Sequence, residues 1–323
     1  MNENIKLVLG FLISLVLVLV VMPSYIKMLK KRNLNQQVSE YALDEYKEKG
    51  KTPIMGGLLF VVFPLLAIVI VNPTIYQDPK ALMIMLAYFL FCLVGFIDDF
   101  LILIMKNNLG LSPKLKMLMQ IVFAALLFIF FRNEMNYSLA IPMCDAEINL
   151  GMILFGLFFV FVFCAESNAV NFTDGMDGLC AGVSAICLLP FLVFAILADE
   201  YNIALIILAV IGGLIGYLKF NFFPAKIFMG DSGSLALGAL FAAIAFALDM
   251  ELILLIVGGV FLWEMFCVCA QITCVKLFHR RIFKYTPIHY AFVLRGLKEK
   301  KVVLIFYGIA TICAIVGLVI GVI

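Results

Sequence analysis

The feature that most restricts this chain is a series of long apolar runs that recur along its whole length. The first extends from Ile5 to Met22, and the last covers 302–322. A hydrocarbon layer about 30 Å thick is crossed by roughly 20 apolar residues in an α-helix. The runs predict an all-α integral membrane protein with about ten transmembrane helices, over 5–26, 55–72, 81–103, 115–131, 150–167, 179–198, 202–218, 234–249, 251–278 and 302–322.

The composition supports lipid as the solvent. Hydrophobic residues make up 65% of the chain and charged residues 14%, whereas soluble domains are about 25% charged. A net charge of only +2 gives no case for a nucleic-acid partner. None of the nine cysteines forms a CxxC pair and most lie in apolar runs, so no disulfide or metal framework is predicted. No internal repeat is obvious, and we expect one membrane domain over 1–323.

The loops between the runs differ sharply in charge. Twenty of the 23 Lys and Arg residues lie near the loops at 27–54, 104–114, 168–178, 219–233 and 279–301. The other side holds only Lys6, Lys80 and Arg132. Because basic loops face the cytoplasm, this asymmetry predicts that the first set is cytoplasmic and that both termini are extracytoplasmic.

Five aspartates gather on the side that we expect to be cytoplasmic. Asp98 and Asp99 end the third run, Asp174 and Asp177 follow the fifth, and Asp231 follows the seventh. Carboxylates at a membrane edge are costly, and therefore indicate function. Adjacent positions on a helix do not face the same way, so Asp98 and Asp99 should have different tasks.

The residues around these aspartates favour a phosphorylated substrate. Carboxylate oxygens suit Mg²⁺, which typically binds one or two carboxylates together with substrate phosphates and water. Gly230 and Ser232 open a helix, whose N–H groups would favour a phosphate. Lys114 and Lys116 flank the set. Together these features predict a cytoplasmic active-site cleft.

The ninth run and the loop that follows it are the other polar region. At about 28 residues, or roughly 42 Å, this run must tilt, bend or project into the cytoplasm. Glu264 and Gln271 are seven residues apart within it and so share one helix face. The loop 278–292 is basic and aromatic, which fits either an anchor in anionic headgroups or a lid over an anionic substrate. It contains His289, one of two histidines.

Seven segments occur in an order that is specific enough to resemble a known family. They are Thr52-Pro-Ile-Met-Gly-Gly57, Gly95-Phe-Ile-Asp-Asp99, Asn107-Asn-Leu-Gly-Leu-Ser112, Ser167-Asn-Ala-Val-Asn-Phe-Thr-Asp-Gly-Met-Asp-Gly178, Phe228-Met-Gly-Asp-Ser-Gly-Ser234, Trp263-Glu264 and Pro287-Ile-His289. This set resembles the phospho-N-acetylmuramoyl-pentapeptide transferases of bacterial peptidoglycan synthesis, within the polyprenyl-phosphate sugar-1-phosphate transferase superfamily. The likeness runs from about residue 36 to 297.

The resemblance implies a reaction and its participants. Undecaprenyl phosphate would attack UDP-MurNAc-pentapeptide, releasing UMP and forming lipid I with Mg²⁺ as cofactor. The family also implies a multi-pass protein of the bacterial plasma membrane, a homodimer, and a target of tunicamycin- and muraymycin-type nucleoside inhibitors.

The resemblance also assigns site residues. Asp98, Asp99, Asp231 and Lys116 would be catalytic, with Asp98 orienting or deprotonating the lipid phosphate and Asp231 binding the metal. The substrate-binding set would be Lys49, Thr52, Asn168, Asn171, Asp174, Gly175, Met176, Asp177, Phe228, Gln271 and His289, with Phe228 stacking on uracil.

Some positions depart from the family pattern. Only the first of three histidines after Pro-Ile is present, because Tyr290 and Ala291 occupy the other two positions, and Ile102 stands where a lysine is usual. These changes leave open a related transferase that uses UDP-GlcNAc or another UDP-sugar. A two-step path through an aspartyl phosphate is the less favoured alternative to direct transfer.

An anion transporter or channel is the rival from another class. Transporters place their polar sites near the bilayer midplane and often contain internal repeats. The aspartates here gather at one face instead, so we favour an enzyme over a transporter or a non-catalytic scaffold.

Overall fold

The protein is a bundle of long apolar helices, seen here in a computed structural model that describes residues 2–32, 52–105, 110–144 and 146–323. Eight helices in the described residues are long and apolar enough to cross a membrane. They are α1 (Glu3–Lys31), α4 (Pro79–Met105), α5 (Pro113–Phe131), α6 (Gly151–Thr173), α7 (Leu179–Leu197), α8 (Tyr201–Asn221), α11 (Gly259–Phe278) and α13 (Glu299–Val322).

Two further predicted spans are shorter helices. These are α3 (Gly57–Val71) and α9 (Asp231–Ala247), with 15 and 17 residues. At 1.5 Å per residue they measure about 22 and 26 Å, a little less than the hydrocarbon thickness. The all-helical membrane fold is therefore confirmed, while a count of ten crossings stays a prediction.

Local sequence signals set several helix ends. The Asn2 side chain accepts the N–H of Asn4 at the start of α1, and Ser112 Oγ accepts the N–H of Leu115 at the start of α5. Asp78 accepts two N–H groups in the first turn of α4. Such side chains bind the donors that a helix N-terminus leaves unpaired.

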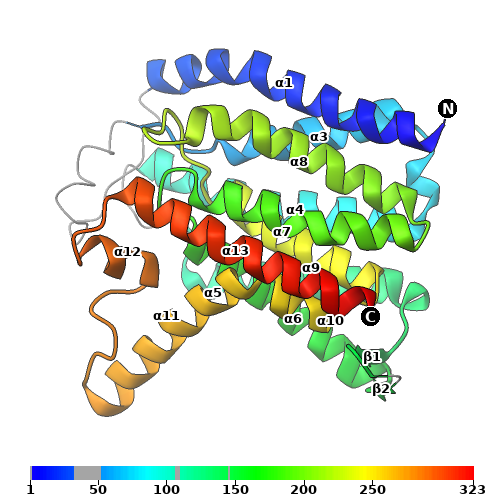
Figure 1. Cartoon of the computed structure of the whole chain (residues 1–323). Helices are drawn as coiled ribbons and strands as arrows, with labels where there is room; N and C mark the ends of the chain where they lie inside the picture. Colours follow the sequence, from blue (N-terminus) through cyan, green and yellow to red (C-terminus); the bar gives the residue numbers. More distant parts are fainter. Residues whose placement is uncertain (1, 33–51, 106–109, 145) are drawn as a thin grey trace.

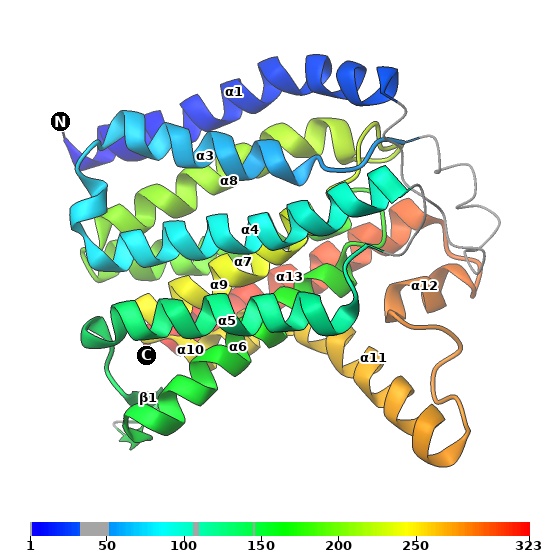
Figure 2. The same cartoon turned by 180° about the vertical axis from the view of Figure 1, so that it is seen from behind.

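Helix α9 occupies the interior of the bundle, between α4 and α6 (Figures 1 and 2). All its residues from Ser232 to Ala247 are buried. Small residues allow the neighbouring backbones to approach closely. A Cβ atom added at Gly95 of α4 would lie 2.1 Å from the carbonyl carbon of Asp231, and one at Gly238 would lie 2.4 Å from the Cα atom of Ser167. The first contact holds the first turn of α9 against α4, and the second holds the middle of α9 against α6.

The predicted ninth run is broken in two. A seven-residue helix, α10 (Glu251–Val257), ends at Gly258, and α11 then leaves the bundle at a steep angle (Figures 1 and 2). The expectation that this run must tilt or bend is confirmed. A Cβ atom at Gly258 would lie 2.8 Å from the Leu254 carbonyl oxygen, so the break occurs where a side chain has no room. The chain returns through the short helix α12 (Ile288–Val293) to α13.

The two ends of the bundle differ in content. Both chain termini lie at one end, which also carries a hairpin of β1 (Ser138–Ile141) and β2 (Ala146–Asn149), paired with Ser138 opposite Asn149 (Figure 1). The hairpin was not predicted, because its strands are only four residues long. The 3₁₀ turns η2 (Ile75–Gln77) and η3 (Arg132–Glu134) complete the described elements. We call this the hairpin end. The opposite end holds the five aspartates that the sequence singles out, and we call it the aspartate end.

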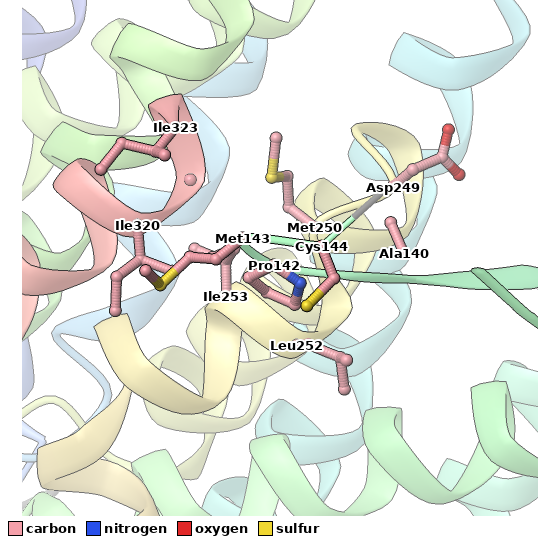
Figure 3. A pocket seen from close by; sticks show the side chains of 11 residues that line it. Ala140, Pro142, Met143, Cys144, Asp249, Met250, Leu252, Ile253, Ile320 and Ile323 are labelled. Carbon is pink, nitrogen blue, oxygen red and sulfur yellow. The ribbon is translucent and has the colours of Figure 1, made fainter. Parts of the chain in front are cut away.

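A cavity of about 360 Å³ lies at the hairpin end (Figure 3). It is lined by the hairpin turn at Pro142, Met143 and Cys144, by Asp249 after α9, and by Ile320 near the end of α13. None of the predicted site residues lines it. The predicted site residues that the structure describes lie instead at the other end of the helices.

Candidate active site

The centre of the candidate site is a lysine held between two aspartates from different helices. Lys116 Nζ, in the first turns of α5, lies 3.0 Å from Asp98 Oδ2 near the end of α4. The same ammonium group donates to Asp231 Oδ2 at the start of α9. Asp98 is only 3% exposed, and its other oxygen accepts the N–H of Leu111 at 2.7 Å. The structure therefore brings three of the predicted catalytic residues together.

Asn171 completes the surroundings of Asp231. Its Nδ2 atom, on α6, donates to Asp231 Oδ1 at 2.8 Å and is 2.9 Å from Ser234 Oγ. Both oxygens of Asp231 are thus engaged, one by a cation and one by an amide. One turn earlier, Asn168 Nδ2 donates to the Gln120 side chain at 2.8 Å and to the Cys164 carbonyl. Gln120, which was not predicted, ties Asn168 to α5.

Asp99 has a different task from Asp98, as its neighbouring position predicts. Its two oxygens accept the N–H groups of Asp231 and Ser232, each at 3.0 Å. Gly230 itself provides no side chain to cap α9, and a Cβ there would lie 2.5 Å from Asp99 Oδ2. Asp99 therefore closes the N-terminus of α9 from another helix. The N–H groups expected to be open to a phosphate are already bonded to this carboxylate.

The turn from Asp174 to Gly178 follows α6 and lies beside this centre. Asp174 accepts the N–H of Gly230, and burial, assisted by Asp231 and Asp177, raises the pKa of Asp174 to about 7. Asp177 Oδ2 accepts the N–H of Ala225 at 2.8 Å. Met176 is buried, and Gly178 has a φ of 78°, a left-handed conformation that glycine adopts at little cost.

Three residues that were not predicted hold the backbone of that turn. Tyr290 Oη donates to the Gly175 carbonyl at 2.8 Å, and Tyr307 Oη donates to the Gly178 carbonyl at 2.6 Å. The N–H of Asp177 donates to Glu299 Oε1 at 2.9 Å. Tyr290 stands beside the recognisable Pro287-Ile-His289 segment, but no sequence signal marks Glu299 or Tyr307. The turn is therefore positioned from α12 and α13.

Glu264 fixes His289, and both side chains are completely buried. Glu264 Oε2 accepts the N–H of Ile288 at 2.7 Å, while Oε1 accepts the N–H of His289 and lies 3.0 Å from its Nδ1. His289 Nε2 faces Gly175, where a Cβ atom would be 2.1 Å away. Glycine at 175 therefore lets the histidine reach the turn.

Gln271 acts on the loop beyond α11. Its Oε1 atom accepts the N–H groups of Ile282 and Phe283, each at 3.0 Å. Glu264 and Gln271 thus share a helix face, as their spacing predicts, and both hold the returning chain. A direct contact of Gln271 with substrate stays a prediction.

The segment before α3 packs against the segment before α9. Phe228 donates its N–H to the Pro53 carbonyl, and its own carbonyl accepts the N–H of Gly56, both at 2.8 Å. The Phe228 ring lies against a small cluster that contains Ile54 and Met55. Thr52 directly precedes this pairing, whereas Lys49 lies outside the described residues.

The side chains at the site can supply only some of the ligands that a magnesium ion needs, and a substrate would have to supply others. No group of three or more His, Cys, Asp or Glu side chains with metal-binding geometry occurs in the described part of the chain. Asp98 and Asp231 nevertheless converge on one positive charge, that of Lys116. Two carboxylates are what Mg²⁺ commonly takes from a protein when phosphates and water supply its other ligands.

Membrane-crossing helices that end in a carboxylate–lysine–amide cluster define a class: integral membrane transferases acting on phosphorylated substrates. Comparison with known proteins narrows this class. Residues 81–249 match the model of glycosyl transferase family 4. The chain belongs to this family, and within it to the phospho-N-acetylmuramoyl-pentapeptide transferases.

The relatives that support this assignment match almost the whole chain. A phospho-N-acetylmuramoyl-pentapeptide-transferase of Clostridium beijerinckii is 38% identical over 97% of this chain and 94% of its own length. One of Staphylococcus saprophyticus is also 38% identical, over 96% of this chain and 98% of its own. One of Bacillus thuringiensis is 36% identical over 97% and 96%.

Proposed function

We propose that this protein transfers phospho-MurNAc-pentapeptide from UDP-MurNAc-pentapeptide to undecaprenyl phosphate. An oxygen of the lipid phosphate attacks the β-phosphorus of the donor. The bond between that phosphorus and the bridging oxygen breaks, UMP leaves with the bridging oxygen, and lipid I is formed. The relatives, which are phospho-N-acetylmuramoyl-pentapeptide-transferases, support this reaction.

The observation that carries the proposal is the Asp98–Lys116–Asp231 bridge at one end of the membrane helices. A lipid-linked phosphate and a water-soluble nucleotide can meet only at a membrane edge. A partly buried positive charge held by carboxylates at that edge is suited to stabilise the charge of a phosphoryl group in transfer.

Each neighbouring residue then takes a role in this reaction. Asp98 orients the acceptor phosphate, which is mostly ionised near neutral pH and needs positioning more than deprotonation. Lys116 interacts with the transferred group. Since both oxygens of Asp98 already accept hydrogen bonds, the geometry supports direct transfer over an aspartyl-phosphate intermediate.

The donor occupies the other half of the site. Asn168, Asn171 and the Asp174–Asp177 turn bind its ribose and diphosphate, and Phe228 stacks on uracil. Lys49, Thr52, Gln271 and His289 complete this half. Asp231 would hold Mg²⁺, and the chemistry that the ion would supply is neutralisation of the phosphate charge.

Membrane placement completes the proposal. Ten crossings, with both termini outside, would place the aspartate end in the bacterial cytoplasm, in agreement with the distribution of basic residues. We further propose a homodimer and sensitivity to tunicamycin- and muraymycin-type nucleosides, as the resemblance implies.

A donor assay tests the proposed specificity. Purified protein in lipid nanodiscs is given undecaprenyl phosphate, Mg²⁺ and either UDP-MurNAc-pentapeptide or UDP-GlcNAc, and UMP release is measured. We expect UMP and lipid I only with the first donor. Release from UDP-GlcNAc alone would establish the rival donor, which the relatives do not favour.

Two substitutions test the site itself. Asp98→Asn and Asp231→Asn each should lower UMP release by at least about 10²-fold while the helical circular dichroism is retained. Asp249→Asn is the matched control, since this exposed aspartate lies at the hairpin end. Wild-type turnover by either site variant would remove that residue from the mechanism.

A further inference from the structure

The helix that leaves the bundle ends in an exposed, basic and apolar tip. We call residues 276–284 the arm tip; it comprises the end of α11 and the start of the chain that returns to α12. Figures 1 and 2 both show α11 diverging from the other helices, so that its C-terminal end stands apart from them. Nothing in the proposed reaction uses this tip.

The tip carries unbalanced positive charge. Lys276, Arg280, Arg281 and Lys284 are all exposed, and the described ion pairs include none of them. No Asp or Glu occurs anywhere from 265 to 298. The counter-charge for these four groups must therefore come from outside this segment.

Large apolar side chains lie among these basic residues. Leu277, Phe278 and Ile282 are 67%, 65% and 56% exposed. Water would disfavour three such exposed side chains close together in the chain, and the hydrocarbon interior would disfavour four cations. The layer of lipid headgroups accepts both, because apolar side chains enter the acyl boundary while basic ends stay at the headgroups.

The apolar surface of the tip continues into the membrane part of α11. Trp263, Phe266 and Ile272 on the same helix are each at least half exposed, and α11 qualifies as a membrane-crossing helix. This continuity favours a lipid surface over a soluble protein as the occupant. Hydrogen bonds also fix the conformation of the tip, because the Gln271 side chain accepts the N–H groups of Ile282 and Phe283.

We propose that the arm tip is a lipid-binding element that binds the anionic headgroups of glycerophospholipids, phosphatidylglycerol in particular. The site is distinct from that of the acceptor lipid and holds bulk lipid. It anchors the end of α11 to the headgroup layer at the aspartate end, at the level where donor and acceptor would meet. The inference does not depend on the proposed reaction, since it concerns binding of lipid and not turnover.

Tryptophan quenching tests this proposal directly, because Trp263 is the only tryptophan in the chain. In a Trp263→Phe background, Phe278→Trp places the single fluorophore in the tip. The protein is reconstituted without the acceptor lipid in bilayers of about 70% phosphatidylcholine and 30% phosphatidylglycerol. This composition is chosen to give the bilayer roughly the negative surface charge of a bacterial membrane. The membrane stays the same in both samples, and only the lipid that carries the bromine atoms changes, at equal mole fraction.

We expect brominated phosphatidylglycerol to quench the tip about two-fold more strongly than brominated phosphatidylcholine. Arg280→Gln together with Arg281→Gln should bring this ratio close to one, as should high salt, which shortens the screening length to about 3 Å at 1 M. Lys298→Gln with Lys301→Gln is the matched control, because these exposed residues flank the start of α13 and not the tip. The control should keep the two-fold preference.

Three results would overturn the proposal: equal quenching by the two lipids, a preference that survives the arginine substitutions, or no quenching by either lipid. Correct insertion is checked in the same arginine variant with the native tryptophan retained. Trp263, which lies 13 positions before Lys276 at the start of the tip, should be quenched by both brominated lipids without preference.

Discussion

Helices α9 and α11 both bring acidic side chains toward the site, but one lies wholly inside the protein and the other mostly outside it. All of α9 from Ser232 to Ala247 is buried, whereas α11 buries only Val260, Phe261, Glu264, Cys267, Val268 and Gln271. The first is held by close backbone contacts with its neighbours, whereas the second uses two polar side chains, Glu264 and Gln271, to hold the chain that returns from it. The site therefore has one wall set by packing and another set by a few hydrogen bonds.

The largest effect should come from disturbing the packed wall. In Gly95→Ala the new methyl group would lie 2.1 Å from the backbone of Asp231, so α4 and α9 must separate. We expect a loss of about 2–4 kcal/mol in stability, with loss of UMP release. Thermal unfolding in detergent measures the first quantity. Gly308→Ala in α13 is the control, because nothing lies within 4 Å of its added Cβ; equal losses in both variants would refute the packing argument.

A change in the wall formed by α11 should disturb the structure only near the substituted residue. Glu264→Gln replaces one of the two accepting oxygens with an NH2 group that cannot accept an N–H, which loosens the start of α12 and His289. We expect turnover to fall about ten-fold, because a buried donor left unpaired costs roughly 1–3 kcal/mol. Global thermal stability should change much less than in Gly95→Ala. Thr273→Val, on an exposed face of α11, should leave both quantities unchanged.

A smaller effect is expected in α12, which follows the loop after α11. Tyr290→Phe removes only the hydroxyl that donates to the Gly175 carbonyl. One such hydrogen bond contributes about 0.5–1.5 kcal/mol. The KM for the nucleotide donor should therefore rise roughly three- to ten-fold with little change in kcat, since the turn binds donor in the proposed mechanism. Steady-state kinetics with Tyr285→Phe as control test this, and a fall in kcat alone would contradict it.

The last prediction concerns the pH dependence of stability. Because the folded pKa of Asp174 is about 7, above its ordinary value of 3.8, the folded state binds this proton more tightly than the unfolded chain. The stability that protonation contributes is complete below about pH 4 and is lost as the pH rises through 7. In EDTA buffer, Asp174→Asn should raise the melting temperature at pH 8 but not at pH 4. The exposed Asp199→Asn should show no such trend, and a parallel trend there would disprove the assignment.

The comparison of the two walls also shows what could be predicted from the sequence. Runs of about 20 apolar residues predict helices wherever lipid is the solvent, because the backbone has no other partner there. The gathering of Asp98, Asp174 and Asp231 at one end follows from the order of runs and loops. Both inferences need only positions along the chain.

The remaining features depend on contacts between distant segments. Nothing local to Asp99 indicates that its carboxylate closes α9, and nothing near Tyr307 or Glu299 indicates that they hold the turn after α6. The break occurs at Gly258, where a side chain would crowd the Leu254 carbonyl oxygen, but many other glycines in this chain lie inside unbroken helices. Such roles become visible only when helices are placed side by side.

The capping of α9 by Asp99 has a consequence for genetics. In a cell, Asp98→Asn and Asp99→Asn would score alike as loss of function, although their causes differ. We expect a protein without the Asp98 charge to fold, accumulate and still bind the nucleotide donor through the other half of the site, so it should act as a dominant inhibitor when expressed beside the wild type. A protein without the Asp99 cap loses the start of α9 and is removed by proteolysis, so its defect should be recessive. Growth of cells that carry both alleles, read with immunoblots of the variant protein, distinguishes the two.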